Sequence, residues 1–503
     1  MNLPELSWND ELGLCRQAGP GHTAPVSRKD HVHNGVYSAT RLGLLAQRGE
    51  LDTQVALTTL RSFRAMQVQQ KGNRQGCLRW YWEEEEPVDT NAAFFIGMAQ
   101  MMLYLAEGEK LEGPVRVAIR EIVADLAVWF GQELHVVDPI YSNKYMGDLV
   151  CSWLAFEVLG CGPPDELLRK TKEWCDYWRR EHWGWGEHMS AVYSVVLLNE
   201  MSAVLLFCQA MPDAIRSDFR GLFENLMAIN DAFGQGPRVP VIRSYAFTGS
   251  AECLPYRDYV RPISPEDDFQ GISMVSNLGG LYGAWYHRAG WLEMAPPKLT
   301  MSEWLEIPCR DNAVARAVVK PNIRIGAMSH YPIMAGVDHQ TWGLSWQTFP
   351  AALWRPAGDW AFWRWTTQEG EIVRSHPATA KWVAYLGNAL STKIDPPPVP
   401  RMKSTLTPEG RLSMERTLTV PIAADWDEVR DVFHLLGSDA KITSEDSVLV
   451  LTWSDCSVRV KYFGDAIPVW NPTEGGGNWV MRYDRANLVG RDTITHKWEL
   501  TLH

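Results

Sequence analysis

The 503-residue sequence lacks long apolar runs, secretory features and paired cysteines. Its apolar runs are short, as in residues 203–208, whereas a membrane-spanning helix needs about 20 consecutive apolar residues. The first residues have neither the basic start nor the apolar stretch of a secretory signal. The nine cysteines are scattered without a Cys-x-x-Cys pair, which argues against a zinc ribbon or a disulfide scaffold. We therefore expect a cytoplasmic protein that has no membrane contact and keeps its cysteines reduced.

Signals for nucleotide, nucleic-acid and metal binding are also scarce. No glycine run is followed by Lys-Ser/Thr, and no strand leads into a Gly-x-Gly-x-x-Gly helix start. The net charge of −12 excludes a broad electrostatic footprint for nucleic acid. His31 and His33 have the spacing of two metal ligands, but no third ligand is evident nearby. We expect no metal, no other cofactor and no nucleic-acid partner.

Tryptophan, in contrast, is abundant, with 24 residues. Most of them must pack in cores or between domains. The flat C–H faces of pyranose rings also pack well on indole. Four tryptophans flank polar residues instead of lying in uniformly apolar runs, namely Trp80, Trp82, Trp183 and Trp185. We interpret these four as candidate sugar contacts, with ordinary packing as the alternative.

The sequence pattern divides the chain into a helical half and a β-rich half. Before Pro296, helix-forming segments recur every 20 to 30 residues, which suits helical hairpins laid side by side. They are predicted at residues 90–106, 113–129, 148–159, 165–180, 190–211 and 214–230. After Pro296, alternating β-branched segments predict strands within 313–338 and 343–354, two strands around a Ser-Asp turn in 442–462, and one in 493–502. The sequence predicts an α+β multidomain protein with a helical domain at 1–300 and an antiparallel β domain at 301–503.

The strongest candidate site is the loop Trp183-Gly-Trp-Gly-Glu-His-Met-Ser190, which runs directly into a helix. Glu187 and His188 lie at or near the start of that helix. Polar groups at loop ends and helix starts face a cleft more often than a core. The alternative is a capping glutamate beside a structural histidine.

A second candidate lies in residues 238–261, where arginines and tyrosines gather in an irregular segment. Arg243 and Arg257 give an acidic protein a locally basic loop suited to a carboxylate. Tyr245 and Tyr256 lie beside these arginines, and a neighbouring positive charge lowers the pKa of a tyrosine hydroxyl and favours proton transfer. Loop polarity and tyrosine packing are the alternative.

Two further polar loops carry candidate groups. His339 lies in a polar turn between strand-like segments, where a histidine is more often a turn residue than a ligand. Asn143 lies in a polar loop before a helix and has an amide that can donate to a carboxylate. The alternative for Asn143 is a plain turn residue.

Helical hairpins with polar, Trp-rich loops followed by an antiparallel β domain resemble the polysaccharide lyases that join an incomplete (α/α) toroid to a β-sandwich. The heparinase II/III and oligoalginate lyase group is the most similar. In that group a histidine starts an inner helix, a tyrosine follows some fifty residues later, and the β domain supplies another histidine. Glu187-His188, Tyr245 and His339 match these three elements.

Residues 247–250 (Phe-Thr-Gly-Ser) also resemble the Tyr-Thr-Gly-Ala-Tyr signature of chondroitin AC and hyaluronan lyases. The catalytic tyrosine of that signature falls here on Ala251, and its preceding histidine falls on Ile242. If the motif is related, the tyrosine has moved to Tyr245 or Tyr256, or the activity is lost or different.

The resemblance implies β-elimination on a uronic-acid oligosaccharide, with exo action. It assigns catalytic roles to His188, Tyr245, His339 and Asn143. It assigns substrate contacts to Arg243, Glu187, Trp183, Trp185, Trp82, Tyr256 and Arg257. The catalytic centre is expected at the junction of the two halves, near residues 295–310.

Two other functions stay open. A glycoside hydrolase needs two carboxylates across the scissile bond, which Glu187, Asp148 or the run Glu83–Glu86 can supply. A non-catalytic carbohydrate-binding protein needs neither the histidines nor the tyrosine. The unsaturated uronate that only a lyase releases discriminates among the three.

Overall fold

The computed structural model describes residues 6–18, 25–26, 29–184, 186–242, 255–260, 282–299, 302–330, 349–356, 358–367, 399–419, 428–464, 467–484, 486, 490–491 and 493–503. The chain forms two compact units. The helical unit comprises Met1–Arg180, Tyr193–Asn230 and Leu254–Lys298, and the strand unit comprises Glu181–Val192, Asp231–Cys253 and Leu299–His503. Residues 181–192 and 231–253, which come from the helical half of the sequence, thus belong to the strand unit.

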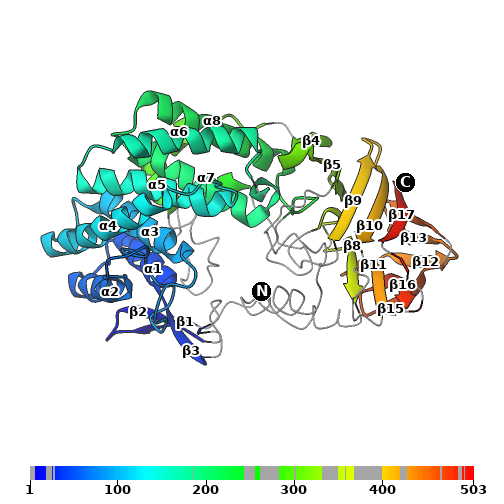
Figure 1. Cartoon of the computed structure of the whole chain (residues 1–503), viewed down its shortest axis with the longest axis horizontal. Helices are drawn as coiled ribbons and strands as arrows, with labels where there is room; N and C mark the ends of the chain where they lie inside the picture. The colour runs from blue at the N-terminus through cyan, green and yellow to red at the C-terminus, as the bar shows by residue number, and fades with distance from the viewer. Residues whose placement is uncertain are drawn as a thin grey trace. The chain divides into compact units, whose positions relative to one another are not determined.

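The helical unit is built from paired helices (Figure 1). Their bounds are α1 Gly35–Arg48, α2 Thr53–Met66, α3 Asn91–Glu107, α4 Gly113–Glu133, α5 Ser142–Leu159, α6 Asp165–Arg180, α7 Ala191–Phe207, α8 Asp213–Phe233, α9 Tyr256–Tyr259 and α11 Trp291–Met294. Helix α1 packs against α3, α2 against α4, and both α3 and α4 against α5. None of the described helices is long and apolar enough to cross a membrane.

The helix boundaries follow local sequence signals. Asn34 caps α1 by accepting from the backbone N–H of Tyr37, and Asp52 caps α2 by accepting from Gln54 and Val55. Pro114 lies in the first turn of α4, where its missing N–H costs nothing. Helix α6 has the predicted bounds, whereas α5 begins six residues earlier than predicted and therefore includes Asn143.

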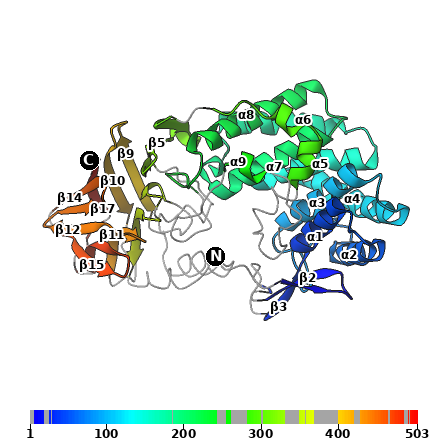
Figure 2. The same ribbon diagram turned by 180° about the vertical axis from the view of Figure 1, so that it is seen from behind.

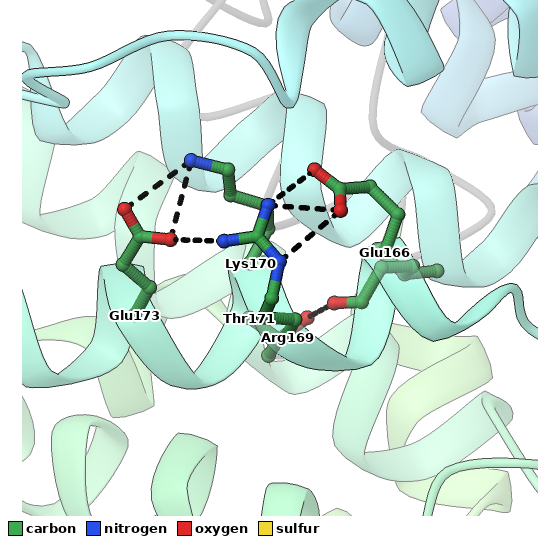
Figure 3. Close-up of polar contacts among 6 residues, drawn as sticks. Glu166, Arg169, Lys170, Thr171 and Glu173 are labelled. Atoms are coloured by element: carbon green, nitrogen blue, oxygen red, sulfur yellow. Dashed lines mark hydrogen bonds and ion pairs between the residues drawn. The ribbon is translucent and has the colours of Figure 1, made fainter.

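Helix α6 shows how the outer layer is stabilised. Its buried side carries Trp174 and Trp178, and its exposed side carries a ladder of ion pairs. Arg169 pairs with Glu166 at 2.7 Å and with Glu173 at 3.0 Å (Figure 3). Exposed ion pairs three and four residues apart contribute little to stability, so tryptophan burial supplies most of the stabilisation.

A small sheet, which the sequence patterns did not predict, precedes the helices. Strands β1 (Leu6–Asn9), β2 (Leu14–Ala18) and β3 (His31–Asn34) pair in antiparallel fashion in that order. The strands are four or five residues long, which is too short for alternation to stand out from a loop.

The strand unit contains two antiparallel sheets (Figure 2). The eight-stranded sheet has the order β15-β16-β11-β8-β7-β6-β5-β4, and the six-stranded sheet has the order β12-β13-β14-β17-β10-β9. The bounds are β4 Trp304–Pro308, β5 Val314–Lys320, β6 Ile323–Met328, β7 Ala351–Trp354, β8 Trp360–Thr367, β9 Val399–Leu406, β10 Arg411–Thr419, β11 Glu428–Leu436, β12 Lys441–Glu445, β13 Val448–Thr452, β14 Ser457–Phe463, β15 Val469–Thr473, β16 Gly476–Asp484 and β17 Thr493–Leu502.

The two sheets pack face to face over an aromatic core. The ring of Trp498 on β17 lies 5.5 Å from that of Trp479 and 6.2 Å from that of Trp363, both on the larger sheet. Asp431 of β11 is buried in the same layer. Its carboxylate binds Arg416 and accepts hydrogen bonds from His496 Nδ1 at 2.9 Å and Trp498 Nε1 at 3.1 Å. These contacts make the unit a β-sandwich.

The α+β class predicted from the sequence is confirmed, with helices first and antiparallel strands after them. Strand β17 has the predicted bounds. The prediction of two strands in 442–462 is wrong, because residues 441–463 form three strands. The additional turn lies at Asp446, whose φ of 47° falls in the left-handed region that aspartate tolerates better than most residues.

Candidate functional site

One face of the eight-stranded sheet carries a group of cations. Side chains alternate between the two faces of a strand, so Arg430 and His434 of β11 point away from the sandwich core that Asp431 and Phe433 enter. Arg482 lies directly opposite Arg430 on β16. Arg364 on β8 lies opposite Val432, which shares this face. We call Arg364, Arg430, His434 and Arg482 the arginine face.

Aromatic rings order the inner part of the arginine face. The guanidinium carbon of Arg364 lies 4.8 Å from the ring centre of Phe349 and 4.9 Å from that of Phe362. The His434 ring stacks on Phe362 at 4.8 Å, and its Nδ1 lies 2.8 Å from Asn478 Oδ1. Arg364 and His434 are buried, whereas Arg482 is exposed. The arginine face thus runs from a buried arginine, Arg364, to an exposed one, Arg482. Such a series of positive charges suits an anionic ligand.

The segment before residue 243 covers the neighbouring part of the same face. Val239 and Val241 pack in one cluster with Phe349, Trp360 and Phe362. Val241 and Phe349 pair as an isolated antiparallel bridge, with N···O distances of 3.1 and 2.8 Å. Phe349 therefore joins this segment to the arginine face.

The loop with Glu187 and His188 attaches to that segment. Glu187–Met189 form a short 3-10 helix (η1), and the Ile242 N–H donates to the Met189 carbonyl at 3.2 Å. Gly186 has a φ of 90°, and a Cβ added there would lie 2.7 Å from Ile242 Cδ1. Only glycine satisfies both the conformation and the close approach.

His188 itself is fully buried. Its Nε2 lies 3.1 Å from the Pro308 carbonyl oxygen and 3.5 Å from Cys309 Sγ. Burial, with the nearby Arg238 charge as a smaller cause, lowers the pKa of His188 to about 3. At neutral pH the imidazole is uncharged, so it can accept a proton or a hydrogen bond but cannot pair ionically with a carboxylate.

The other predicted residues of this region divide into two groups. Glu187 and Trp183, which are near His188 in the sequence, are both buried. Trp183 also has a positive φ of 64°. Their roles in substrate binding stay predictions. Four predicted residues lie outside the described part of the chain: Trp185, Arg243, Tyr245 and His339. The 247–250 motif lies outside it as well.

In the helical unit, Asn143 is buried in the first turn of α5. Its neighbour Lys144 pairs with Glu133 of α4 at 2.6 Å and with Asp148. Burial is the main cause that raises the pKa of Asp148 to about 7, against the attraction of Lys144. This cluster holds two carboxylates around one lysine. The catalytic role of Asn143 stays a prediction.

The remaining candidates of the helical unit differ in exposure. Tyr256 is fully buried, its hydroxyl lies 3.0 Å from Ser202 Oγ, and burial raises its pKa far above the usual range. Arg257 is half-buried and donates to the Pro296 carbonyl at 2.6 Å. Trp82 is half-buried, and its backbone N–H donates to the His33 carbonyl. In this structure Tyr256 is a core contact, and only Arg257 and Trp82 reach the surface.

In the part of the chain that the structure describes, His31 and His33 are not arranged as a metal-binding site. His33 Nδ1 lies 2.6 Å from Glu83 Oε1, and its Nε2 lies 3.0 Å from Asn9 Nδ2. Both ring nitrogens of His33 are therefore engaged. Among the described residues, no group of three or more His, Cys, Asp or Glu side chains is placed to hold a metal ion.

Sequence reasoning missed Arg364 and His434. Arg364 stands between two tryptophans in the strand Trp360–Thr367, and a charged residue at such a place was the available signal. His434 carries no comparable signal, because its neighbours in space come from distant parts of the chain. Arg238 lies in the candidate segment 238–261, but its contact with the loop of His188 could not be predicted.

No protein-family model matches this sequence, and no curated protein matches it. Among solved structures, the fold is similar to one described as "Crystal Structure of Heparinase III". The two share 8% sequence identity with a TM-score of 0.48, and the match covers 93% of this chain and 75% of that one. At this TM-score the likeness concerns the course of the backbone and carries no statement about substrate or mechanism.

Proposed function

We propose that this protein is a lyase that cleaves uronic-acid-containing oligosaccharides by β-elimination, with exo action, and that its helical unit is an incomplete (α/α) toroid. One observation carries the proposal. The Met189 carbonyl binds Ile242, and Val241 pairs with Phe349, so three distant segments meet through their backbones. The first segment carries His188, and the other two precede Tyr245 and follow His339 in the sequence.

The positions along the chain make this meeting informative. His188 directly precedes Met189, Tyr245 follows Ile242 by three residues, and His339 precedes Phe349 by ten. The proximity of these described residues supports the proposal that His188, Tyr245 and His339 form one site.

The arginine face supports an acidic substrate. The protein carries a net charge of −12, so an anion needs a local concentration of positive charge. Arg364, Arg430 and Arg482 supply it on three adjacent strands. Arginine binds carboxylate and sulfate oxygens through two parallel hydrogen bonds, which also fixes their orientation.

The chemistry requires two tasks. The C5 proton of a uronate is weakly acidic, so hydrogen bonds to the carboxylate must stabilise the charge that develops when the proton leaves. Arg243 is suited to donate such bonds, whereas the ring N–H of neutral His188 is already bound to the Pro308 carbonyl. Tyr245 would take the C5 proton or protonate the leaving oxygen, with His339 or His188 as its partner.

The test is a product assay on a panel of uronate oligosaccharides and polysaccharides. A lyase releases a 4,5-unsaturated uronate that absorbs ultraviolet light, at a rate equal to the rate at which new chain ends appear. Tyr245→Phe and His188→Ala should abolish the absorbance increase, whereas Tyr483→Phe, on β16 with its hydroxyl on His496 in the sandwich, should keep it. New chain ends without absorbance would instead indicate a hydrolase, and binding without turnover would indicate a carbohydrate-binding protein.

The hydrolase alternative has one observation in its favour. Glu133 and Asp148 flank Lys144, and the pKa of Asp148 is raised to about 7, as a general acid requires. Asp148 is fully buried and already bound to Lys144, so it would have to be uncovered to meet a sugar. Asp148→Asn separates the two functions, because it should abolish hydrolysis and leave β-elimination intact.

A further inference from the structure

Arg238 is a fully buried arginine to which the proposed chemistry gives no task. Its guanidinium Nη1 donates to the carbonyl oxygens of His188 and, at 3.2 Å, of Ser190. The carbonyl between them, on Met189, accepts from the Ile242 N–H. Three consecutive carbonyls of the histidine loop are therefore held by one short segment, residues 238–242.

A second buried arginine fixes that segment in turn. Arg324 on β6 donates to the carbonyls of Pro237 at 2.6 Å and Phe233 at 2.7 Å, and also to that of Gln235. Its guanidinium lies 5.0 Å from the Trp354 ring on the neighbouring strand. The sheet thus positions residues 233–237, and Arg238 at their end positions the loop with His188.

The side chain of His188 shows what this positioning achieves. A carbonyl oxygen can only accept, so the contact of Nε2 with the Pro308 carbonyl assigns the ring proton to Nε2. Nδ1 then carries the lone pair, and it is buried without a hydrogen-bond partner among the described residues. A rotation of the backbone at residue 188 would break the Pro308 contact and turn Nδ1 away.

We propose that Arg238 is a positioning residue for the lyase reaction: by holding the His188 and Ser190 carbonyls, it fixes the His188 ring with Nε2 on Pro308 and Nδ1 as the accepting atom. The assignment rests on the proposed function for its catalytic consequence. Its structural part, the orientation and tautomer of His188, stands apart from any activity.

The positive charge of Arg238 also acts on the pKa of His188, which an uncharged packing residue would not do. After burial, it is one of the causes that keep the pKa of His188 low. Arg238→Lys keeps the charge, but its shorter side chain withdraws the donor from the two carbonyls that Nη1 reaches, whereas Arg238→Met loses both the charge and the donor. The two variants therefore distinguish geometry from charge.

The experiment combines turnover, thermal unfolding and nitrogen-15 NMR of selectively labelled histidines. Arg238→Lys should lower kcat by about tenfold or more with little change in KM, since about 1.4 kcal/mol of transition-state stabilisation corresponds to tenfold. Arg238→Met should lower kcat further and move the His188 titration to higher pH. Arg355→Lys is the matched control, because Arg355 is also a buried arginine of the strand unit and pairs with Asp455; it should lower the unfolding temperature and leave kcat unchanged.

The outcomes are separable. If the wild type makes no unsaturated uronate, the proposed function fails, and the NMR spectra still decide whether Arg238 sets the tautomer and titration of His188. Unchanged kcat in both Arg238 variants of an active enzyme would overturn the positioning role. An unchanged His188 titration and tautomer in Arg238→Met would overturn it as well. If Arg238→Met does not fold, Arg238→Lys alone decides through kcat and the tautomer.

Discussion

Val241 and Phe349 pair through two backbone hydrogen bonds, although more than a hundred residues separate them in the chain. The pairing places a strand-unit aromatic ring beneath a segment that comes from the helical half of the sequence. The Phe349 ring then contacts Phe362 and Arg364. Phe349 thus connects residues 239–241, through its backbone, to the arginine face, through its side chain.

Phe349→Ala should break the link between residues 239–241 and the arginine face. Removing a fully buried phenylalanine costs about 3–5 kcal/mol of unfolding free energy through lost burial and the cavity left behind. Phe433→Ala, equally buried but in the sandwich core, is the matched control. Denaturant unfolding should show similar losses, and activity per folded molecule should fall only in Phe349→Ala. Equal activity in the two variants would contradict the role of Phe349.

Arg430→Gln should weaken the binding of acidic oligosaccharides. A charge-assisted hydrogen bond contributes about 1.5–3 kcal/mol, so we expect KM to rise about tenfold or more. The salt dependence of KM should also become shallower, because one screened attraction is lost. Arg459→Gln, an exposed arginine on β14 of the other sheet, should change neither quantity. A rise in KM of the same size for Arg459→Gln would show that overall charge, and not the arginine face, governs binding.

His188 should make the protein sensitive to acid. Its pKa is near 3 in the folded protein and 6.5 in the reference state, so the unfolded chain binds the proton more tightly. The contribution to stability is fully present above pH 6.5 and decreases as the pH falls toward 3. His188→Gln should flatten the fall of unfolding free energy between these limits, measured by denaturant titration at several pH values. An unchanged pH dependence would contradict the low pKa.

The Asp431–Arg416 pair should behave as a buried ion pair. Breaking such a pair by removing one partner costs about 3–5 kcal/mol, because the other charge stays buried and unpaired. Arg416→Met and Asp431→Asn should each destabilise the strand unit by this amount. The double variant should cost less than the sum of the single variants, as a double-mutant cycle of unfolding free energies would measure. Strict additivity would contradict a direct coupling.

The composition and periodicity of the sequence determined the class of fold. The spacing of apolar residues, Pro114 and the acidic start of α6 are local signals, and local signals suffice to predict helices and the long strand β17. They failed for short elements such as β1 and for the hairpin at Asp446, where few residues carry the pattern.

The sequence also singled out the loop of Glu187 and His188, because two glycines and two tryptophans before a helix are unusual. It could not show that His188 contacts Pro308, some 120 residues away, or that burial lowers its pKa, since both depend on contacts with distant parts of the chain. Arg364 and His434 became visible only when strand pairing placed them near Phe349, and the contacts of Arg238, which lies in a candidate segment, with the loop of His188 came only from the tertiary structure. Strand register and long-range backbone pairing are set by the packing of the whole sheet, and therefore only the tertiary structure decided which side chains meet.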